Sequence, residues 1–145
     1  MRVVLDTNVW ISGLLWKGAP MQVVRLAEQA KIEVWATQEI LAELEESLDY
    51  ERLARRLREL KLMIADVMVS VTALVSLIEL DDLERVVPED TDDDVFPNCA
   101  RAVSAKYLIS GNKHVLKLRE WQGVLIVTPR EFLEREFPET WEFTR

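Results

Sequence analysis

Short apolar runs alternate with segments of helical spacing along the whole chain. The apolar runs are rich in valine, isoleucine and leucine and cover residues 2–5, 32–36, 107–110 and 124–127. This composition is typical of buried strands. Strands that alternate with helices favour a mainly parallel sheet with helices packed on both faces. We therefore predict an α/β fold, a three-layer α/β/α sandwich, in which residues 1–145 form a single domain.

The segments between the apolar runs carry helix signals. Spacing and composition predict helices over residues 21–30, 50–60 and 95–105. Two more helices are expected to begin after Thr37 and Thr128, because threonine is a favoured N-cap. Thr128 is followed by Pro129 and Glu131, which complete the sequence signature of a helix start.

Residues 62–78 are the most apolar part of the chain. The stretch is at the lower limit for a membrane span, but polar side chains interrupt it, namely Asp66, Ser70, Thr72 and Ser76. Apolar residues fall at helical spacing through it, so we expect one helix that is buried on one face. The partly apolar second face predicts contact with a second copy of the chain, and hence a homodimer.

The formal net charge of −8 argues against a protein that coats nucleic acid through a basic surface. A nuclease remains compatible with this charge, because a carboxylate cluster that binds cations itself lowers the net charge. Basic residues occur in two groups that we expect to be solvated helix faces. The groups are Arg52, Arg55, Arg56, Arg58 and Lys61, and Lys113, Lys117 and Arg119.

Cysteine content and the first residues of the chain point to the cytoplasm. The chain has one cysteine, Cys99, so it can form neither an internal disulfide nor a cysteine-based zinc site. The first residues reach Asp6 without the long apolar run of a signal peptide. We expect a cytoplasmic protein without a membrane span.

Several acids stand where a strand ends or a helix begins. Asp6 directly follows the first strand, Glu43 lies on the helix after the second, and Asp92, Asp93 and Asp94 precede a later helix. In such sheets, ligands bind at the carboxyl ends of the strands. Adjacent carboxylates repel one another unless a cation holds them, and Mg²⁺ prefers oxygen ligands. The pattern therefore predicts a divalent cation site that could orient a phosphate and activate a water.

Each of these acids also has a purely structural interpretation. Asp6 could cap the segment that follows it, and Glu43 could be an ordinary solvated acid on its helix. One of the three consecutive aspartates could be the N-cap of the next helix. A single cap, however, does not account for three aspartates in a row.

Several motifs along the chain together resemble the PIN domain. They are LDTNVWISGLL, EILAELEESL, DTDDDVF, YLISGNKHVL and GVLIVTPREFLE, and they follow one another in the order typical of the family. The chain looks most like the branch that includes toxin components of toxin–antitoxin pairs, related to VapC-type ribonucleases. The resemblance implies an endoribonuclease that depends on Mg²⁺ or Mn²⁺ and cuts single-stranded RNA. It also implies a homodimer and an antitoxin protein as partner.

The resemblance further implies which residues form the site. The acids of the family that hold the metal and carry catalysis match Asp6, Glu43 and Asp94. The supporting positions match Asn8, Asp92, Ser110 and Asn112.

The strand-turn SGNKHVL departs from the pattern TGDKDLL that is typical of the family. Asn112 stands where a metal-facing aspartate is expected, and His114 stands at a second aspartate position. Asparagine offers a neutral oxygen but no charge, so we expect weaker binding of Mg²⁺, particularly of a second ion. His114 could contact phosphate or favour Mn²⁺, or it could be a surface residue with no special role.

Three other functions stay open on the sequence. Asn112 and His114 would suit a non-catalytic PIN domain that acts as an RNA-binding or protein-interaction module. A phosphotransfer enzyme of the haloacid-dehalogenase type also has an aspartate after its first strand, but it needs a second aspartate where this chain has Asn8. The acidic loop could instead bind a structural cation. Trp10 and Trp16 could stack RNA bases or pack in the core or in a dimer contact.

Overall fold

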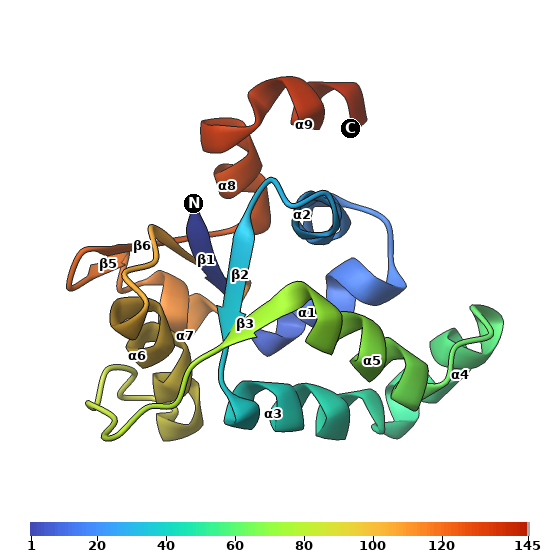
Figure 1. Ribbon diagram of the computed structural model, residues 1–145, viewed down its shortest axis with the longest axis horizontal. Helices are drawn as coiled ribbons and strands as arrows, with labels where there is room; N and C mark the ends of the chain where they lie inside the picture. Colours follow the sequence, from blue (N-terminus) through green and yellow to red (C-terminus); the bar gives the residue numbers. More distant parts are fainter. Residues whose placement is uncertain (145) are drawn as a thin grey trace.

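One six-stranded sheet runs through the part of the chain that the computed structural model describes, residues 1–144 (Figure 1). The strands are β1 (Arg2–Leu5), β2 (Glu33–Ala36), β3 (Val75–Leu77), β4 (Tyr107–Ile109), β5 (Glu120–Trp121) and β6 (Val124–Val127). Their order across the sheet is β3-β2-β1-β4-β6-β5. All neighbouring pairs are parallel except β5 and β6.

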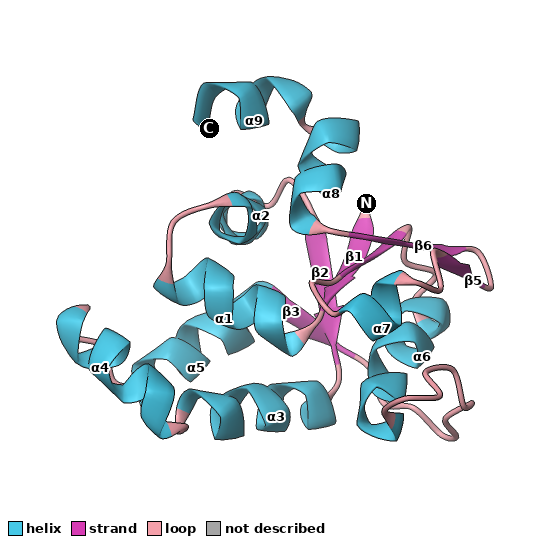
Figure 2. Ribbon diagram, turned by 180° about the vertical axis from the view of Figure 1, so that it is seen from behind, coloured by secondary structure: helices cyan, strands magenta, loops and turns pink. Residues whose placement is uncertain are grey.

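Helices cover both faces of this sheet. They are α1 (Thr7–Leu15), α2 (Ala19–Glu28), α3 (Gln38–Leu48), α4 (Glu51–Glu59), α5 (Ile64–Leu74), the 3₁₀ turn η1 (Thr91–Asp94), α6 (Val95–Ala102), α7 (Lys113–Leu116), α8 (Pro129–Glu136) and α9 (Pro138–Thr144). Figures 1 and 2 show α6 on one side of the sheet and α1, α2 and α5 on the other. The predicted α/β class and its three-layer arrangement are confirmed.

Strand β1 lies in the middle of the sheet, between β2 and β4. Val3, Val4 and Leu5 are fully buried, because helices cover both faces of a parallel sheet. A strand buried on both faces reads as a continuous apolar run, which is why this element was recognisable from the sequence. Asp6 therefore emerges at the carboxyl end of the central strand.

Local capping chemistry explains several helix starts. The Thr37 hydroxyl accepts a hydrogen bond from the Ile40 amide over 3.1 Å, at the start of α3. Thr128 and Glu131 form a reciprocal capping box at the start of α8, as their spacing predicts. Both predicted helix starts are confirmed.

The prediction of one helix over residues 62–78 is wrong. Helix α5 ends at Leu74, and the next three residues form β3, an edge strand that pairs with β2 in parallel. Spacing alone cannot separate a short strand from the last turn of an apolar helix. Helix α1 was not predicted because it begins directly after β1, with no intervening turn signal. The short elements β5, α7 and α9 were also missed.

The core contains Trp10 at 0% exposure, so this tryptophan cannot stack an RNA base. Trp16 lies at the end of α1 and is 43% exposed. In residues 1–144 there is no helix with both the length and the apolar character needed to cross a bilayer.

Candidate active site

A pocket of about 200 Å³ opens at the carboxyl ends of β1 and β4. Its walls come from the start of α1, from α3 and the beginning of α4, from the acidic turn η1 with α6, and from the turn after β4. The lining residues are Asp6, Thr7, Asn8, Glu43, Ser47, Tyr50, Arg52, Asp93, Phe96 and Asn112. Strands β1 and β4 are paired, so the topology brings Asp6 beside a turn that lies more than 100 positions later in the chain.

Asp6 is 4% exposed and is held through both carboxylate oxygens. Oδ1 accepts a hydrogen bond from the Val9 amide over 2.9 Å, which caps α1. Oδ2 accepts from the Ser110 hydroxyl and from the Gly111 amide. Burial raises the pKa of Asp6, and these hydrogen bonds act against that rise. Asp6 is therefore both a helix cap and a fixed acid of the pocket.

Glu43 reaches the same pocket from α3. Its Oε2 accepts a hydrogen bond from the Thr7 hydroxyl over 2.8 Å. Burial raises the pKa of Glu43, and the charges of Asp92 and Asp6 raise it further. Thr7 thus orients the glutamate toward the end of β1.

Asp93 supplies the third carboxylate of the pocket. Its Oδ2 accepts a hydrogen bond from the side-chain amide of Asn112 over 3.0 Å. Burial raises the pKa of Asp93 to about 6, and the charges of Asp90, Glu43 and Asp6 contribute to the rise. Asp6, Glu43 and Asp93 therefore act on one another as like charges in one small space.

Asp94, which the sequence assigned to the site, is not brought together with Asp6 and Glu43. Its carboxylate is buried and accepts hydrogen bonds from the Val86 and Val87 amides over 3.0 and 2.7 Å. This aspartate ties the segment before η1 to the start of α6. Sequence reasoning found the aspartate triplet but missed Asp93, because the register of a helical turn decides which of three consecutive side chains faces the pocket.

The predicted supporting residues differ in their burial and in whether they line the pocket. Ser110 is buried, and its oxygen also accepts a hydrogen bond from the Asn112 amide over 3.0 Å. Asn8 is exposed and lines the pocket. Asp92 is exposed and does not line the pocket, although its charge acts on Glu43.

His114 lies outside the pocket, where its Nδ1 is 4.0 Å from the Glu89 carboxylate. Lys117 forms an ion pair with the same glutamate. These contacts belong to the surface beside α7, so a direct role for His114 among the pocket acids has no support in the geometry.

The donor set of the pocket suits a hard divalent cation. Asp6, Glu43 and Asp93 offer carboxylate oxygens, which Mg²⁺ and Mn²⁺ accept readily. Within the described residues, however, no three side chains of Asp, Glu, His or Cys stand close enough together to hold one ion jointly. Because Mg²⁺ usually takes one or two carboxylates and keeps several waters, these residues fit a partly hydrated ion.

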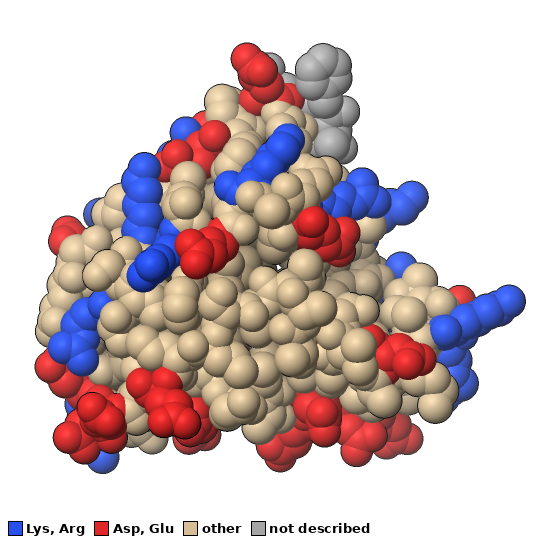
Figure 3. Space-filling model, viewed as in Figure 1, with Lys and Arg blue, Asp and Glu red and all other residues tan. Residues whose placement is uncertain are grey.

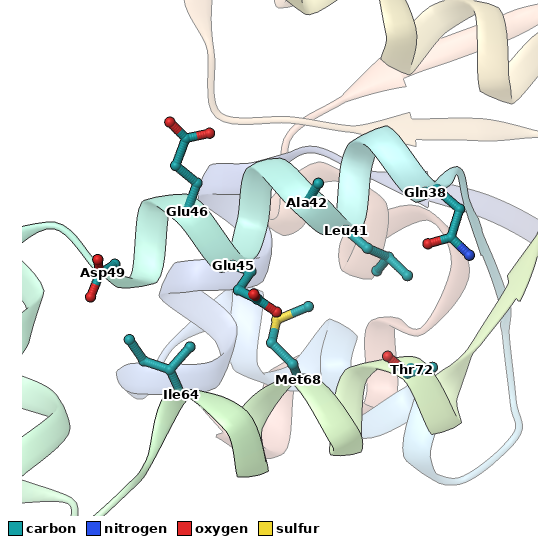
Figure 4. Close-up of a pocket in the computed structure, with 9 residues that line it drawn as sticks. All are labelled: Gln38, Leu41, Ala42, Glu45, Glu46, Asp49, Ile64, Met68 and Thr72. Carbon is teal, nitrogen blue, oxygen red and sulfur yellow. The ribbon is translucent and has the colours of Figure 1, made fainter.

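A larger cavity, of about 580 Å³, lies between α3 and α5 (Figure 4). Leu41, Ile64 and Met68 give it an apolar floor, and Glu45 and Asp49 are among the acids that border it. None of the three pocket acids lines this cavity. It is therefore a separate feature of the surface on the far side of α3 from Glu43.

Comparison with known proteins agrees with this geometry. A family model described as the PIN domain matches residues 2–114, which include all three pocket acids and Asn112. PIN domains are a family of nucleases. Among curated proteins, the search found no match to the chain. Because this match covers most of the chain, the chain belongs to the PIN domain family.

Proposed function

We propose that this protein is a metal-dependent endoribonuclease that cuts single-stranded RNA in the pocket of Asp6, Glu43 and Asp93. One observation carries the proposal: three carboxylates share a small pocket in which burial raises the pKa of each. Such an arrangement costs stability, and perturbed acids of this kind cluster at functional sites. Membership of a nuclease family supports the same reading.

Of Asp6, Glu43 and Asp93, one or two would hold a partly hydrated Mg²⁺ or Mn²⁺, because no three such acids among the described residues stand close enough to hold one ion jointly. When bound, the ion would supply Lewis-acid activation of the phosphate and of a water. The remaining groups position the acids. Ser110 and Gly111 hold Asp6 in place, and Thr7 orients Glu43.

The proposed reaction is hydrolysis of a phosphodiester. The water oxygen forms a bond to phosphorus, the bond from phosphorus to the leaving oxygen breaks, and that oxygen takes a proton from solvent. The attacking water must lose a proton, and a pocket carboxylate that does not hold the ion would accept it as a general base.

The first experiment is cleavage of unstructured single-stranded RNA in Mg²⁺ and in Mn²⁺. We expect Asp6→Asn and Asp93→Asn to lower the rate by about 100-fold or more, the scale of a lost catalytic acid or base. Asp94→Asn is the matched control, and we expect it to keep its rate per folded molecule. The proposal fails if the wild-type protein cuts no RNA with either ion, or if Asp93→Asn cuts as fast as wild type.

A second candidate function is a non-catalytic PIN domain that binds RNA or a protein. The Asn112 side chain favours it, because an amide group occupies the Asp93 oxygen that a metal would need. The doubly changed variant Asn112→Asp with His114→Asp separates the two candidates. If only that variant cuts RNA, the natural protein is a disabled relative; if both cut, the nuclease function holds.

We also propose that the protein is a homodimer that uses α5. Met63, just before this helix, is 68% exposed and Val69 within it is 70% exposed, and burial of these apolar side chains against a second copy would favour association. Sedimentation should show a dimer for wild type and a monomer for Val69→Asp. A wild-type monomer at micromolar concentration would contradict the proposal.

A role as a toxin is a further part of the proposal, and it rests on the resemblance to toxin components. Induced expression of the wild-type chain in bacterial cytoplasm should arrest growth, whereas Asp6→Asn should not. A partner protein that acts as antitoxin should restore growth when both are expressed. Equal growth with wild type and Asp6→Asn would remove the toxin role and leave the nuclease proposal standing.

A further inference from the structure

Two aromatic side chains beside α4 are each covered by an arginine of that helix. The guanidinium of Arg52 lies 5.7 Å from the ring centre of Tyr50, and that of Arg56 lies 5.6 Å from the ring centre of Trp16. Arg52 and Arg56 are four positions apart and therefore occupy the same face of α4. The helix thus presents two arginine–aromatic pairs in a row.

The first pair borders the carboxylate pocket. Tyr50 and Arg52 both line it, and Arg52 is the only cation among the described lining residues. Arg55 and Arg56 form ion pairs with Glu59, whereas no ion pair of Arg52 is found among the described residues. A cation that borders three acids without pairing to them is available to an anion that enters the pocket.

The second pair is fixed to the end of α1. The Arg56 Nε donates a hydrogen bond over 2.7 Å to the carbonyl of Leu15, the residue before Trp16. This contact holds Trp16 against α4 while its side chain stays 43% exposed; Tyr50 is 47% exposed. Large aromatic rings are normally well buried, so two rings held half-exposed in a row are available for contact with a ligand.

The charge distribution agrees with a nucleic-acid ligand at this edge of the molecule. Figure 3 shows Lys and Arg side chains gathered over α4, while Asp and Glu side chains line α3. The chain as a whole carries a net charge of −8, so the basic helix is a local exception. A phosphate backbone would be attracted to α4 and repelled by the neighbouring acidic surface.

We propose that the pairs Tyr50–Arg52 and Trp16–Arg56 form a track that holds one RNA strand as it leaves the carboxylate pocket. Bases stack on the open faces of the two rings, and Arg52 contacts the phosphate next to the one that is cut. Such stacking tolerates any base, so the track binds single strands without a strong sequence preference. Duplex RNA keeps its bases stacked inside the helix and cannot use it. This inference rests on the proposed nuclease function for the identity of the strand.

The test measures binding of the full chain to a short, unstructured RNA that carries a fluorescent label at one end. Binding is measured by fluorescence anisotropy in EDTA, so that metal-dependent cleavage does not interfere. We expect Trp16→Ala to weaken binding about fivefold or more, the lower end of the effect of losing a stacking contact. We expect Arg52→Gln to weaken binding by a similar factor, because it removes a phosphate contact. Arg58→Gln is the matched control, because Arg58 is exposed on α4 but lies on a different face. We expect it to change binding by less than about twofold. A duplex of the same sequence should bind more weakly and should not respond to Trp16→Ala.

Two results would overturn the track. One is equal weakening by Arg52→Gln and Arg58→Gln, which would show only a diffuse charge effect. The other is unchanged binding in both Trp16→Ala and Tyr50→Ala.

Cleavage in Mn²⁺ is measured separately on the same proteins. If binding depends on Arg52 and Trp16 but the protein cuts no RNA, the track is supported and the nuclease proposal is contradicted. If the wild-type protein cuts RNA but the variants bind RNA as tightly as wild type, the nuclease proposal is supported and the track is contradicted.

Discussion

The side-chain amide of Asn112 donates a hydrogen bond to the carboxylate of Asp93 over 3.0 Å. The other end of the same amide sets its orientation, because Asn112 Oδ1 accepts from the His114 backbone amide over 2.8 Å and so caps α7. The NH₂ group, and not the oxygen, therefore faces the acids. This donor offsets part of the repulsion among the carboxylates, and it also occupies an oxygen that a cation would use.

Replacement of Asn112 by aspartate should lower the stability of the metal-free protein and raise its affinity for a metal ion. In the metal-free protein, Asn112→Asp removes a donor to Asp93 and adds a like charge, which should cost about 1.5–3 kcal/mol of unfolding free energy near neutral pH. Mn²⁺ should restore more stability to this variant than to wild type. Thermal unfolding in EDTA and in Mn²⁺ measures both effects. Asn8→Asp adds an acid to the pocket lining without removing the bond to Asp93, so it should lose less; an equal loss would show that charge alone matters.

The raised pKa of Asp93 should make the metal-free protein lose stability as the pH rises. Because burial raises this pKa from 3.8 to about 6, the folded state binds more protons than the unfolded state between these values. The free energy of unfolding should therefore fall between about pH 4 and pH 6 on account of this group. Urea unfolding in EDTA across this range should show a smaller fall for Asp93→Asn. Asp82→Asn, in an exposed loop, should follow wild type. The same slope in wild type and Asp93→Asn would contradict the expectation.

Replacement of Asp94 should lower the stability of the protein more than replacement of Asp93, which we assign to the chemistry of the pocket. Asp94→Ala leaves the amides of Val86 and Val87 without their acceptor, and Val87 is buried. We expect a loss of about 1–3 kcal/mol in the free energy of unfolding at pH 7, measured by urea denaturation. Asp93→Ala should lose less or gain stability there, because it relieves repulsion. If the two variants change in the opposite order, the division of roles between these neighbours is wrong.

The contact between α1 and α2 requires glycine at position 13. A Cβ atom at Gly13 would stand 2.6 Å from Val24 Cγ2 and 2.7 Å from the Pro20 carbonyl oxygen. Gly13→Ala should therefore destabilise the protein by about 1–3 kcal/mol, the usual cost of overpacking. Gly111→Ala is the control for stability, since a Cβ there meets nothing within 4 Å. Thermal unfolding of both variants in EDTA checks the difference, and equal midpoints would show that α2 shifts at little cost.

Local chemistry was sufficient to predict some elements and insufficient for others. Thr37 and Thr128 cap helices through bonds to residues three positions away, so their role is readable from the sequence. The end of α5 is different. Val75–Leu77 continues the apolar pattern of the helix before it, and it becomes a strand because the edge of β2 offers unpaired backbone groups. That partner lies about forty positions earlier and leaves no local signal.

The sequence by itself determined the α/β class, the acid at the end of the central strand and the presence of an aspartate triplet before α6. These properties follow from the order of apolar runs and from residue types at their ends. Only the tertiary structure decided that Asp93 lines the pocket with Asp6 and Glu43, while Asp94 holds the loop amides of Val86 and Val87. Successive side chains on a helical turn point roughly 100–120° apart, so one step of register exchanges a pocket acid for a structural one. Packing of η1 against α6, and of α6 against strands from distant parts of the chain, sets that register.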